Sequence, residues 1–76
     1  MRVYITRLPA LPNWQVKIRT QWYMGEYVAF TSIPVSTGMV SVNGRNANEH
    51  LAVHEAIDLV EELVNRIQYP YAGKLN

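Results

Sequence analysis

Residues 47–67, ANEHLAVHEAIDLVEELVNRI, are the stretch of this sequence that decides the fold. Each residue of an α-helix advances about 100° around the axis, and at that spacing the apolar residues fall within one arc of roughly 160°. The opposite arc carries charged and polar side chains, with Leu51 as its apolar exception. The stretch therefore predicts one long amphipathic helix that buries one face and exposes the other.

The ends of this helix are indicated by capping residues. Asn46, followed three residues later by Glu49, is typical of a capping box, in which each side chain bonds a free backbone amide at the helix start. Pro70 is expected to end the helix, because the residue before a proline avoids the helical conformation. Residues 69–76 then form a C-terminal tail, which either folds back against the sheet edge or is mobile.

Upstream of the helix, four short runs rich in β-branched and aromatic residues predict strands. They are Val3–Leu8, Trp14–Tyr23, Glu26–Ile33 and Met39–Val42. In the second run apolar and polar residues alternate, so one face of that strand is apolar. Met24 and Gly25 are expected to form the tight hairpin turn between the two long strands, with Gly25 at positive φ.

An apolar strand face and an apolar helix arc are expected to pack together. The predicted fold class is therefore α+β: a three- or four-stranded antiparallel meander with one long C-terminal amphipathic helix across one face, in the order β-β-β-β-α. A chain of 76 residues has room for one core, so residues 1–76 are expected to form a single small domain.

The composition narrows the possible chemistry. The sequence contains no cysteine, which excludes disulfides, thiolate metal sites and a cysteine nucleophile. Its apolar runs are too short or too interrupted for a signal peptide or a membrane span, so we expect a cytoplasmic protein without a membrane partner. The sequence has no serine elbow, phosphate loop or enclosed pair of carboxylates, so we expect neither enzyme activity nor a cofactor.

The uncovered face of the sheet is the expected binding surface. Its candidates are polar, basic and aromatic residues of the second strand together with a tyrosine of the third: Gln15, Lys17, Arg19, Gln21, Tyr23 and Tyr27. Tyrosine and basic residues suit protein interfaces, and the same side chains can stack on bases and contact phosphates. A protein partner is the leading expectation, DNA or RNA is the alternative, and a homodimer interface or a merely solvated face are further readings.

Formal charge is divided unevenly along the chain. Residues 1–45 contain five basic residues and one acidic residue, whereas residues 46–76 contain two basic and five acidic ones. The predicted sheet is therefore basic and the predicted helix acidic, which suggests two surfaces with different partners or one surface that faces a second copy, although small domains also segregate charge by chance. The net charge of +1 is lower than expected for a dedicated nucleic-acid-binding domain.

One set of residues has a spacing that can bind a metal. His50 and His54 lie four residues apart and share a helix face with Asp58 and Glu61, an arrangement that can hold zinc or nickel. A solvated helix face is the simpler interpretation, since an exposed helix lacks the enclosing wall of a metal site. We therefore predict no metal site and retain these four residues as the candidates for one.

Two resemblances to known families bear on function as analogies of fold. The order of elements resembles the plant AP2 domain and integrase arm-binding domains, which implies DNA binding by the sheet. Residues 25–63 resemble the N-terminal part of HicB-type antitoxins, although the Pro-Asp-x-Pro-Gly sequence of that family is missing; the matching residues are Gly25, Tyr27, Phe30, Pro34, Gly38, Gly44 and Glu49. That second resemblance implies a small protein that binds and inhibits another protein. The sequence thus predicts a non-enzymatic inhibitor or regulatory module, of the kind carried by phages or mobile elements.

Overall fold

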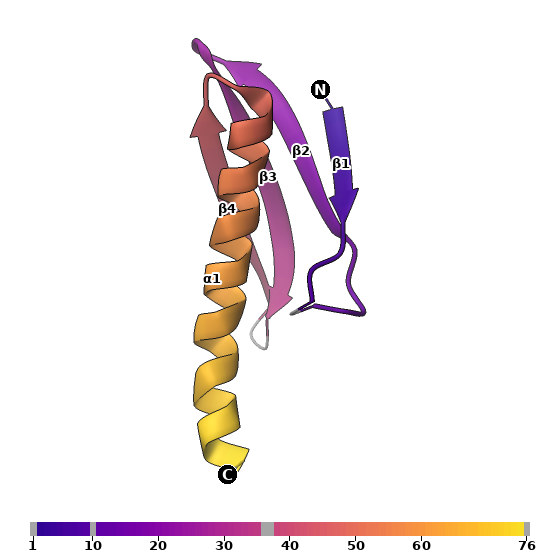
Figure 1. Cartoon of the computed structure of the whole chain (residues 1–76), viewed down its shortest axis with the longest axis vertical. Helices are drawn as coiled ribbons and strands as arrows, with labels where there is room; N and C mark the ends of the chain where they lie inside the picture. The colour runs from indigo at the N-terminus through magenta and orange to yellow at the C-terminus, as the bar shows by residue number, and fades with distance from the viewer. Residues whose placement is uncertain (1, 10, 36–37, 76) are drawn as a thin grey trace.

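The computed structural model describes residues 2–9, 11–35 and 38–75, with side chains as far as Arg66. Within these residues, four strands precede one helix (Figure 1): β1 (Arg2–Thr6), β2 (Val16–Tyr23), β3 (Glu26–Val35), β4 (Gly38–Asn46) and α1 (Glu49–Leu75). The strands form one sheet in the order β1-β2-β3-β4, and each neighbouring pair is antiparallel. The predicted α+β meander with a C-terminal helix is confirmed. Over the described residues, no helix is both long and apolar enough to cross a membrane.

The first two strands are shorter than predicted. β1 ends at Thr6 and β2 begins at Val16, and residues 7–9 and 11–15 between them lie outside the strands. Two backbone hydrogen bonds shape this loop: the Leu11 amide donates to the Leu8 carbonyl at 2.9 Å, and the Trp14 amide donates to the Leu11 carbonyl at 3.1 Å. Leu8 and Trp14 therefore pack from a loop rather than from strands, contrary to the prediction.

The third and fourth strands are longer than predicted. β3 continues past Ile33 to Val35, and β4 runs through Asn46. Pro34, which lies just beyond the predicted third strand, is inside β3 opposite Met39. At this level β3 is paired with β4 and no longer with β2. A strand bonded on one side can carry a proline whose missing amide faces the free side.

The turn between β2 and β3 is the predicted two-residue hairpin. Tyr23 pairs with Glu26, so Met24 and Gly25 are its central residues. Both have positive φ, 51° for Met24 and 86° for Gly25. Two positive φ angles define a type I′ turn, whose twist matches that of the flanking strands. Methionine is an unusual residue for the first position, where asparagine and glycine are preferred.

We predict that Met24→Asn stabilises the fold by about 0.5–1 kcal/mol, because asparagine tolerates the left-handed conformation better than methionine does. Met24 is 84% exposed, so the substitution removes little packing. The check is the midpoint of urea unfolding, with Met24→Leu as the control that should leave it nearly unchanged. A midpoint that does not rise for Met24→Asn would contradict the assigned turn.

The start of α1 differs from the predicted capping box. The helix begins at Glu49, and Asn48 is its N-cap, since the Asn48 Oδ1 atom accepts a hydrogen bond from the Leu51 amide at 3.2 Å. Asn46 closes the preceding turn by accepting from the Asn48 amide at 2.9 Å and also donates to Glu55 at 3.1 Å. The Glu49 side chain does not bond Asn46 and accepts hydrogen bonds from Thr20 and Tyr4 of the sheet instead.

The predicted end of the helix at Pro70 is wrong. The α1 backbone continues through Pro70 to Leu75. A proline removes one amide donor and disfavours the helical conformation of the residue before it, but these effects carry an energetic cost and do not forbid a helix. The mobility expected of residues 69–76 stays a prediction, and Asn76 lies outside the described residues.

Helix α1 packs over β3 and β4 and reaches part of β2 (Figure 1). The helix and the sheet approach closely at Gly44 of β4, which is buried. A Cβ atom at Gly44 would lie 2.5 Å from the Ala52 carbonyl oxygen and 2.8 Å from the Ala56 amide nitrogen. Both are backbone atoms, so they cannot rotate away. Small residues on both sides, including Ala29 opposite Gly44, therefore bring the helix backbone against the strand backbone.

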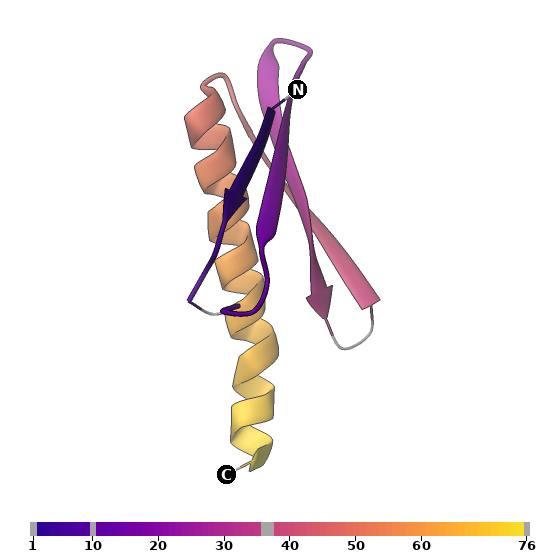
Figure 2. The same ribbon diagram turned by 90° about the vertical axis from the view of Figure 1, so that its right-hand side faces the viewer.

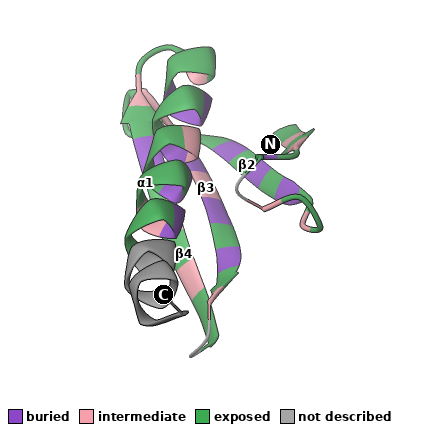
Figure 3. Cartoon of the chain, turned by 60° about the horizontal axis from the view of Figure 1, so that its bottom comes forward, coloured by how far each residue is buried: buried purple, intermediate pink, exposed green. Residues whose placement is uncertain are grey.

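The buried core lies between α1 and one face of the sheet (Figure 3). It consists of small and branched aliphatic residues: Leu8, Val16, Ile18, Ala29, Ile33, Ala52, Val53, Ala56, Val60 and Val64. On β2 the buried residues are Val16, Ile18 and Thr20, while Lys17 and Arg19 between them are exposed. The predicted alternation of faces along β2 is therefore confirmed, and the face away from α1 is uncovered.

We predict that Gly44→Ala destabilises the protein by about 1–3 kcal/mol, because the added methyl group overpacks a contact made of backbone atoms. The effect should outweigh the gain of up to about 1 kcal/mol that alanine usually brings over glycine inside a strand. The neighbouring substitution Asn43→Ala, on the uncovered face, is the matched control and should change stability by about 0.5 kcal/mol or less. Urea unfolding measures both, and an unchanged Gly44→Ala midpoint would be inconsistent with this packing.

Candidate binding surface

The sheet divides into two hairpins that separate along its length. β2 and β3 are paired from Arg19 opposite Phe30 to Tyr23 opposite Glu26. Beyond Arg19, β2 is paired with β1 and β3 is paired with β4. Figure 2 shows the resulting fork, with the β1–β2 and β3–β4 hairpins diverging away from the shared turn. Inside the fork, the Thr31 hydroxyl donates a hydrogen bond of 2.6 Å to the Lys17 carbonyl, which satisfies a backbone acceptor near the point of divergence.

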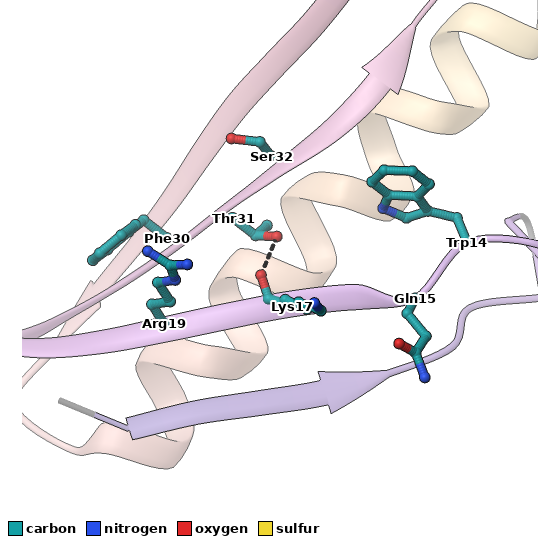
Figure 4. A pocket seen from close by; sticks show the side chains of 7 residues that line it. All are labelled: Trp14, Gln15, Lys17, Arg19, Phe30, Thr31 and Ser32. Carbon is teal, nitrogen blue, oxygen red and sulfur yellow. Dashed lines mark hydrogen bonds between the residues drawn. The ribbon is translucent and has the colours of Figure 1, made fainter.

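A groove of about 540 Å³ opens at this fork (Figure 4). It is lined by Trp14, Gln15, Lys17, Arg19, Phe30, Thr31 and Ser32. Lys17, Arg19, Phe30 and Ser32 belong to the uncovered face, whereas Thr31 and Trp14 belong to the layer that packs toward α1. The groove therefore has walls from the uncovered face and a floor that reaches into the core layer.

The floor of the groove contains an unsatisfied hydrogen-bond donor. The Trp14 ring packs against the core, and its Nε1 atom is buried without a hydrogen-bond partner among the described residues. A buried donor that loses water without gaining an acceptor costs about 1–3 kcal/mol. Buried tryptophan N–H groups usually find a partner, so this orphan donor needs a physical explanation.

The uncovered face also exposes aliphatic side chains. Val3 and Ile5 of β1 are 54% and 58% exposed, and Met39 of β4 is 59% exposed. The register places Val3 beside Arg19 and Ile5 beside Lys17, so apolar and basic side chains adjoin. The exposed side chains of Val3 and Ile5 therefore form, with the neighbouring Lys17 and Arg19, a mixed apolar and basic surface next to the groove.

The two basic residues of the groove have no compensating carboxylate nearby. Over the described side chains, neither Lys17 nor Arg19 forms an ion pair. The third basic residue of this face, Arg45, lies 3.7 Å from Glu26. The positive charge of the uncovered face is therefore concentrated at the groove.

The structure brings five of the six predicted binding residues to one face. Gln15, Lys17 and Arg19 line the groove, and Gln21 and Tyr23 continue the same face of β2 toward the turn. The predicted placement of the sixth residue, Tyr27, on this face is wrong.

Tyr27 lies on the face that packs toward α1. The two-residue turn pairs Tyr27 with Trp22, and residues paired across strands point to the same side of a sheet. The two rings meet edge to face with centroids 4.9 Å apart. Tyr4 shares this face and packs against the core, so it too lies away from the candidate surface. Once the turn fixes the register, the same pairing rule places Phe30 on the candidate face beside Arg19. Sequence reasoning missed four residues that line the groove: Trp14, Phe30, Thr31 and Ser32.

The candidate metal ligands do not converge. In the part of the chain that the structure describes, no group of three or more histidine, aspartate and glutamate side chains is close enough to hold a metal ion. His54, Asp58 and Glu61 are exposed along α1. The His50 ring instead lies edge to face with Tyr4, at a centroid distance of 6.3 Å.

Glu49 connects the start of α1 to the β1–β2 hairpin. Its carboxylate accepts hydrogen bonds from the Thr20 hydroxyl at 2.8 Å, the Tyr4 hydroxyl at 3.0 Å and the Arg2 guanidinium at 3.4 Å. The side chain is 15% exposed. The Thr20 hydrogen bond is the main reason that the pKa of Glu49 lies below its ordinary value of 4.5, with help from Tyr4 and Arg2 and against the opposing effect of partial burial.

We predict that Glu49→Gln lowers the melting temperature at pH 7, and that the difference from the unmodified protein shrinks below pH 4.5. The pKa of Glu49 is lower in the folded state than in the unfolded state, so the carboxylate stabilises the fold above pH 4.5. That stabilisation is lost as the pH falls from 4.5 through the lowered pKa. Thermal unfolding followed by circular dichroism from pH 7 to pH 3 tests this.

Glu61→Gln is the control for this prediction, because it removes the same charge from an exposed position of α1. It should leave the melting temperature at pH 7 nearly unchanged. A Glu49→Gln difference that keeps the same size at every pH would show that the carboxylate charge has no part in holding the hairpin to the helix.

Comparisons with known proteins add no assignment. No protein-family model matches this chain, and no match is found among curated proteins or among solved structures. The resemblances to antitoxins and to DNA-binding domains therefore stay expectations from the sequence, and the function has to be argued from the surface itself.

Proposed function

We propose that this chain is a non-enzymatic binding protein that takes a protein partner on the uncovered face of its sheet, and that it acts as an inhibitor or regulatory module. The observation that carries the proposal is the fork groove with unpaired Lys17 and Arg19, bordered by the exposed aliphatic residues Val3 and Ile5. A protein interface combines an apolar centre with polar and charged groups around it.

The exposed aliphatic residues favour a protein over a nucleic acid. A nucleic acid would be held mainly by phosphate contacts, which need several basic residues on one surface. This face offers Lys17 and Arg19, while Arg45 is already close to Glu26. Phosphates would leave Val3 and Ile5 uncovered, whereas a protein partner can bury them and gain about 25 cal/mol for each Å² of apolar surface removed from water.

The proposal includes the reducing cytoplasm as the location. A chain without cysteine gains no disulfide stabilisation from an oxidising compartment. In that setting a small domain that offers one binding surface suits stoichiometric inhibition or regulation of another protein.

We predict that the double substitution Lys17→Glu/Arg19→Glu weakens partner binding at least about tenfold. The two introduced carboxylates would repel the acidic surface of the partner that Lys17 and Arg19 attract. The partner is captured with tagged protein from a lysate of the source organism, identified and purified, and its affinity is measured by titration calorimetry. Arg7→Glu/Arg66→Glu changes the net charge equally at exposed sites outside the groove, and it should retain the affinity.

Equal affinity of the purified partner for both double variants would remove the uncovered face as the interface. Fluorescence anisotropy with duplex DNA, single-stranded DNA and RNA at about 50 and 200 mM salt tests the competing class. Nucleic-acid binding that falls steeply with salt and is lost in the Lys17→Glu/Arg19→Glu variant would replace the protein-partner proposal. If the unmodified protein has the mass of a dimer in solution and the Lys17→Glu/Arg19→Glu variant has the mass of a monomer, the partner is a second copy of this chain.

A further inference from the structure

We propose that the fork groove is a carboxylate-binding site, in which an acidic side chain of the partner accepts a hydrogen bond from Trp14 Nε1 and pairs with Lys17 and Arg19. This inference rests on the proposed function and names the chemistry of the partner at its anchor point. Three independent features of the groove support it: an unpaired donor, unpaired charge and an open fork between the strands.

The unpaired donor is the Trp14 indole at the floor. Its Nε1 atom is buried and lacks an acceptor among the described residues, although it belongs to a ring that lines the groove (Figure 4). The Thr31 hydroxyl lines the same groove and donates its hydrogen to the Lys17 carbonyl, but it does not accept a hydrogen bond from the indole N–H. An acceptor supplied from outside would remove the cost of leaving the indole N–H unpaired.

The unpaired charge is on the walls. Lys17 and Arg19 lie on the same face of β2, two residues apart, and neither has a carboxylate partner among the described side chains. Arg19 stands beside Phe30 of β3, so the basic residues border an aromatic surface. A guanidinium or ammonium group forms its strongest hydrogen bonds with ionised acceptors such as a carboxylate.

The separation of β2 and β3 puts the Trp14 indole and the basic side chains around one groove. Beyond the last β2–β3 pair, Arg19 and Phe30, the groove is lined both by residues of the uncovered face and by Trp14 and Thr31 of the layer toward α1. A carboxylate has two acceptor oxygens, so one can meet the indole N–H while the other meets a basic side chain. The Nε1 atom has no exposed surface in the free chain, so a lining side chain must move when the ligand enters.

The indole N–H of Trp14 gives a direct readout by nuclear magnetic resonance. The probe is the blocked peptide acetyl-Gly-Glu-Phe-Glu-Gly-amide, and the matched control is the same peptide with glutamine in place of glutamate. We expect the Glu peptide to shift the Trp14 indole proton downfield in a saturable manner and to bind about tenfold more tightly than the Gln peptide. The Trp22 indole, in the same protein but outside the groove, is the internal reference.

Matched variants separate the site from general charge attraction. Arg19→Gln and Arg45→Gln remove the same charge from the same face, but only Arg19 lines the groove. Arg19→Gln should weaken the Glu peptide about tenfold and Arg45→Gln should not. Trp14→Phe, checked for folding by circular dichroism, should weaken the Glu peptide, with backbone amide shifts as the readout.

Three outcomes would overturn the carboxylate site: equal affinity for the Glu and Gln peptides, an unmoved Trp14 indole at saturation, or no binding of the Glu peptide at about 10 mM. A thymidine octanucleotide or inorganic phosphate that shifts the Trp14 indole at lower concentration than the Glu peptide would also overturn it, in favour of phosphate. The proposal of a protein partner on the uncovered face is tested separately, by whether the purified partner binds the Lys17→Glu/Arg19→Glu variant more weakly than the unmodified protein.

Discussion

The contact between the backbone of β4 at Gly44 and the backbone of α1 at Ala52 and Ala56 is the constraint on which the rest of the structure depends. It places the helix over β3 and β4. The β1–β2 hairpin then reaches the helix through longer groups, notably the hydrogen bonds that Tyr4 and Thr20 donate to Glu49. The helix is thus held by a close backbone contact on the β3–β4 hairpin, and on the β1–β2 hairpin by the buried side chains of Val16 and Ile18 together with the hydrogen bonds to Glu49.

The fork lies between these two differently attached hairpins. The β3–β4 hairpin follows the helix at Gly44, while the β1–β2 hairpin is tied to the start of the helix by Glu49. Pairing between β2 and β3 persists near the shared turn and stops at Arg19 and Phe30. Branched side chains of the core, such as Ile18 and Ile33, fill the space under the separated strands from the helix side. The uncovered face is therefore interrupted by a groove at the place where its basic residues lie.

The sequence predicted the order of elements well because that order depends on local patterns. The alternation along β2, the turn at Met24 and Gly25 and the apolar arc of α1 are each visible within a few residues. The predicted bounds of the strands are less accurate. A proline such as Pro34 usually marks the end of a strand, but here β3 is paired only with β4 at that level, so the proline is tolerated.

The site was harder to predict because it depends on contacts between distant residues. The N-cap is Asn48 and not Asn46, and Glu49 has partners on the sheet, one of them 45 residues away in the sequence. Tyr27 was assigned to the wrong face because the face of a strand residue follows from the register of the hairpin. Nothing in the local sequence around Trp14 indicates that its N–H is left without an acceptor, because that property arises from the fork.

The measurement that tests this account most directly is the set of nuclear Overhauser contacts of Gly44 and Phe30. If α1 lies against the backbone of β4, the Gly44 α-protons give strong contacts to the Ala56 amide proton, and Phe30 gives contacts to strand neighbours such as Arg19 but none to α1. Contacts between the Phe30 ring and α1, with none between Gly44 and the helix, would mean that the helix covers the opposite face. The groove would then be closed and the proposed binding surface would not exist.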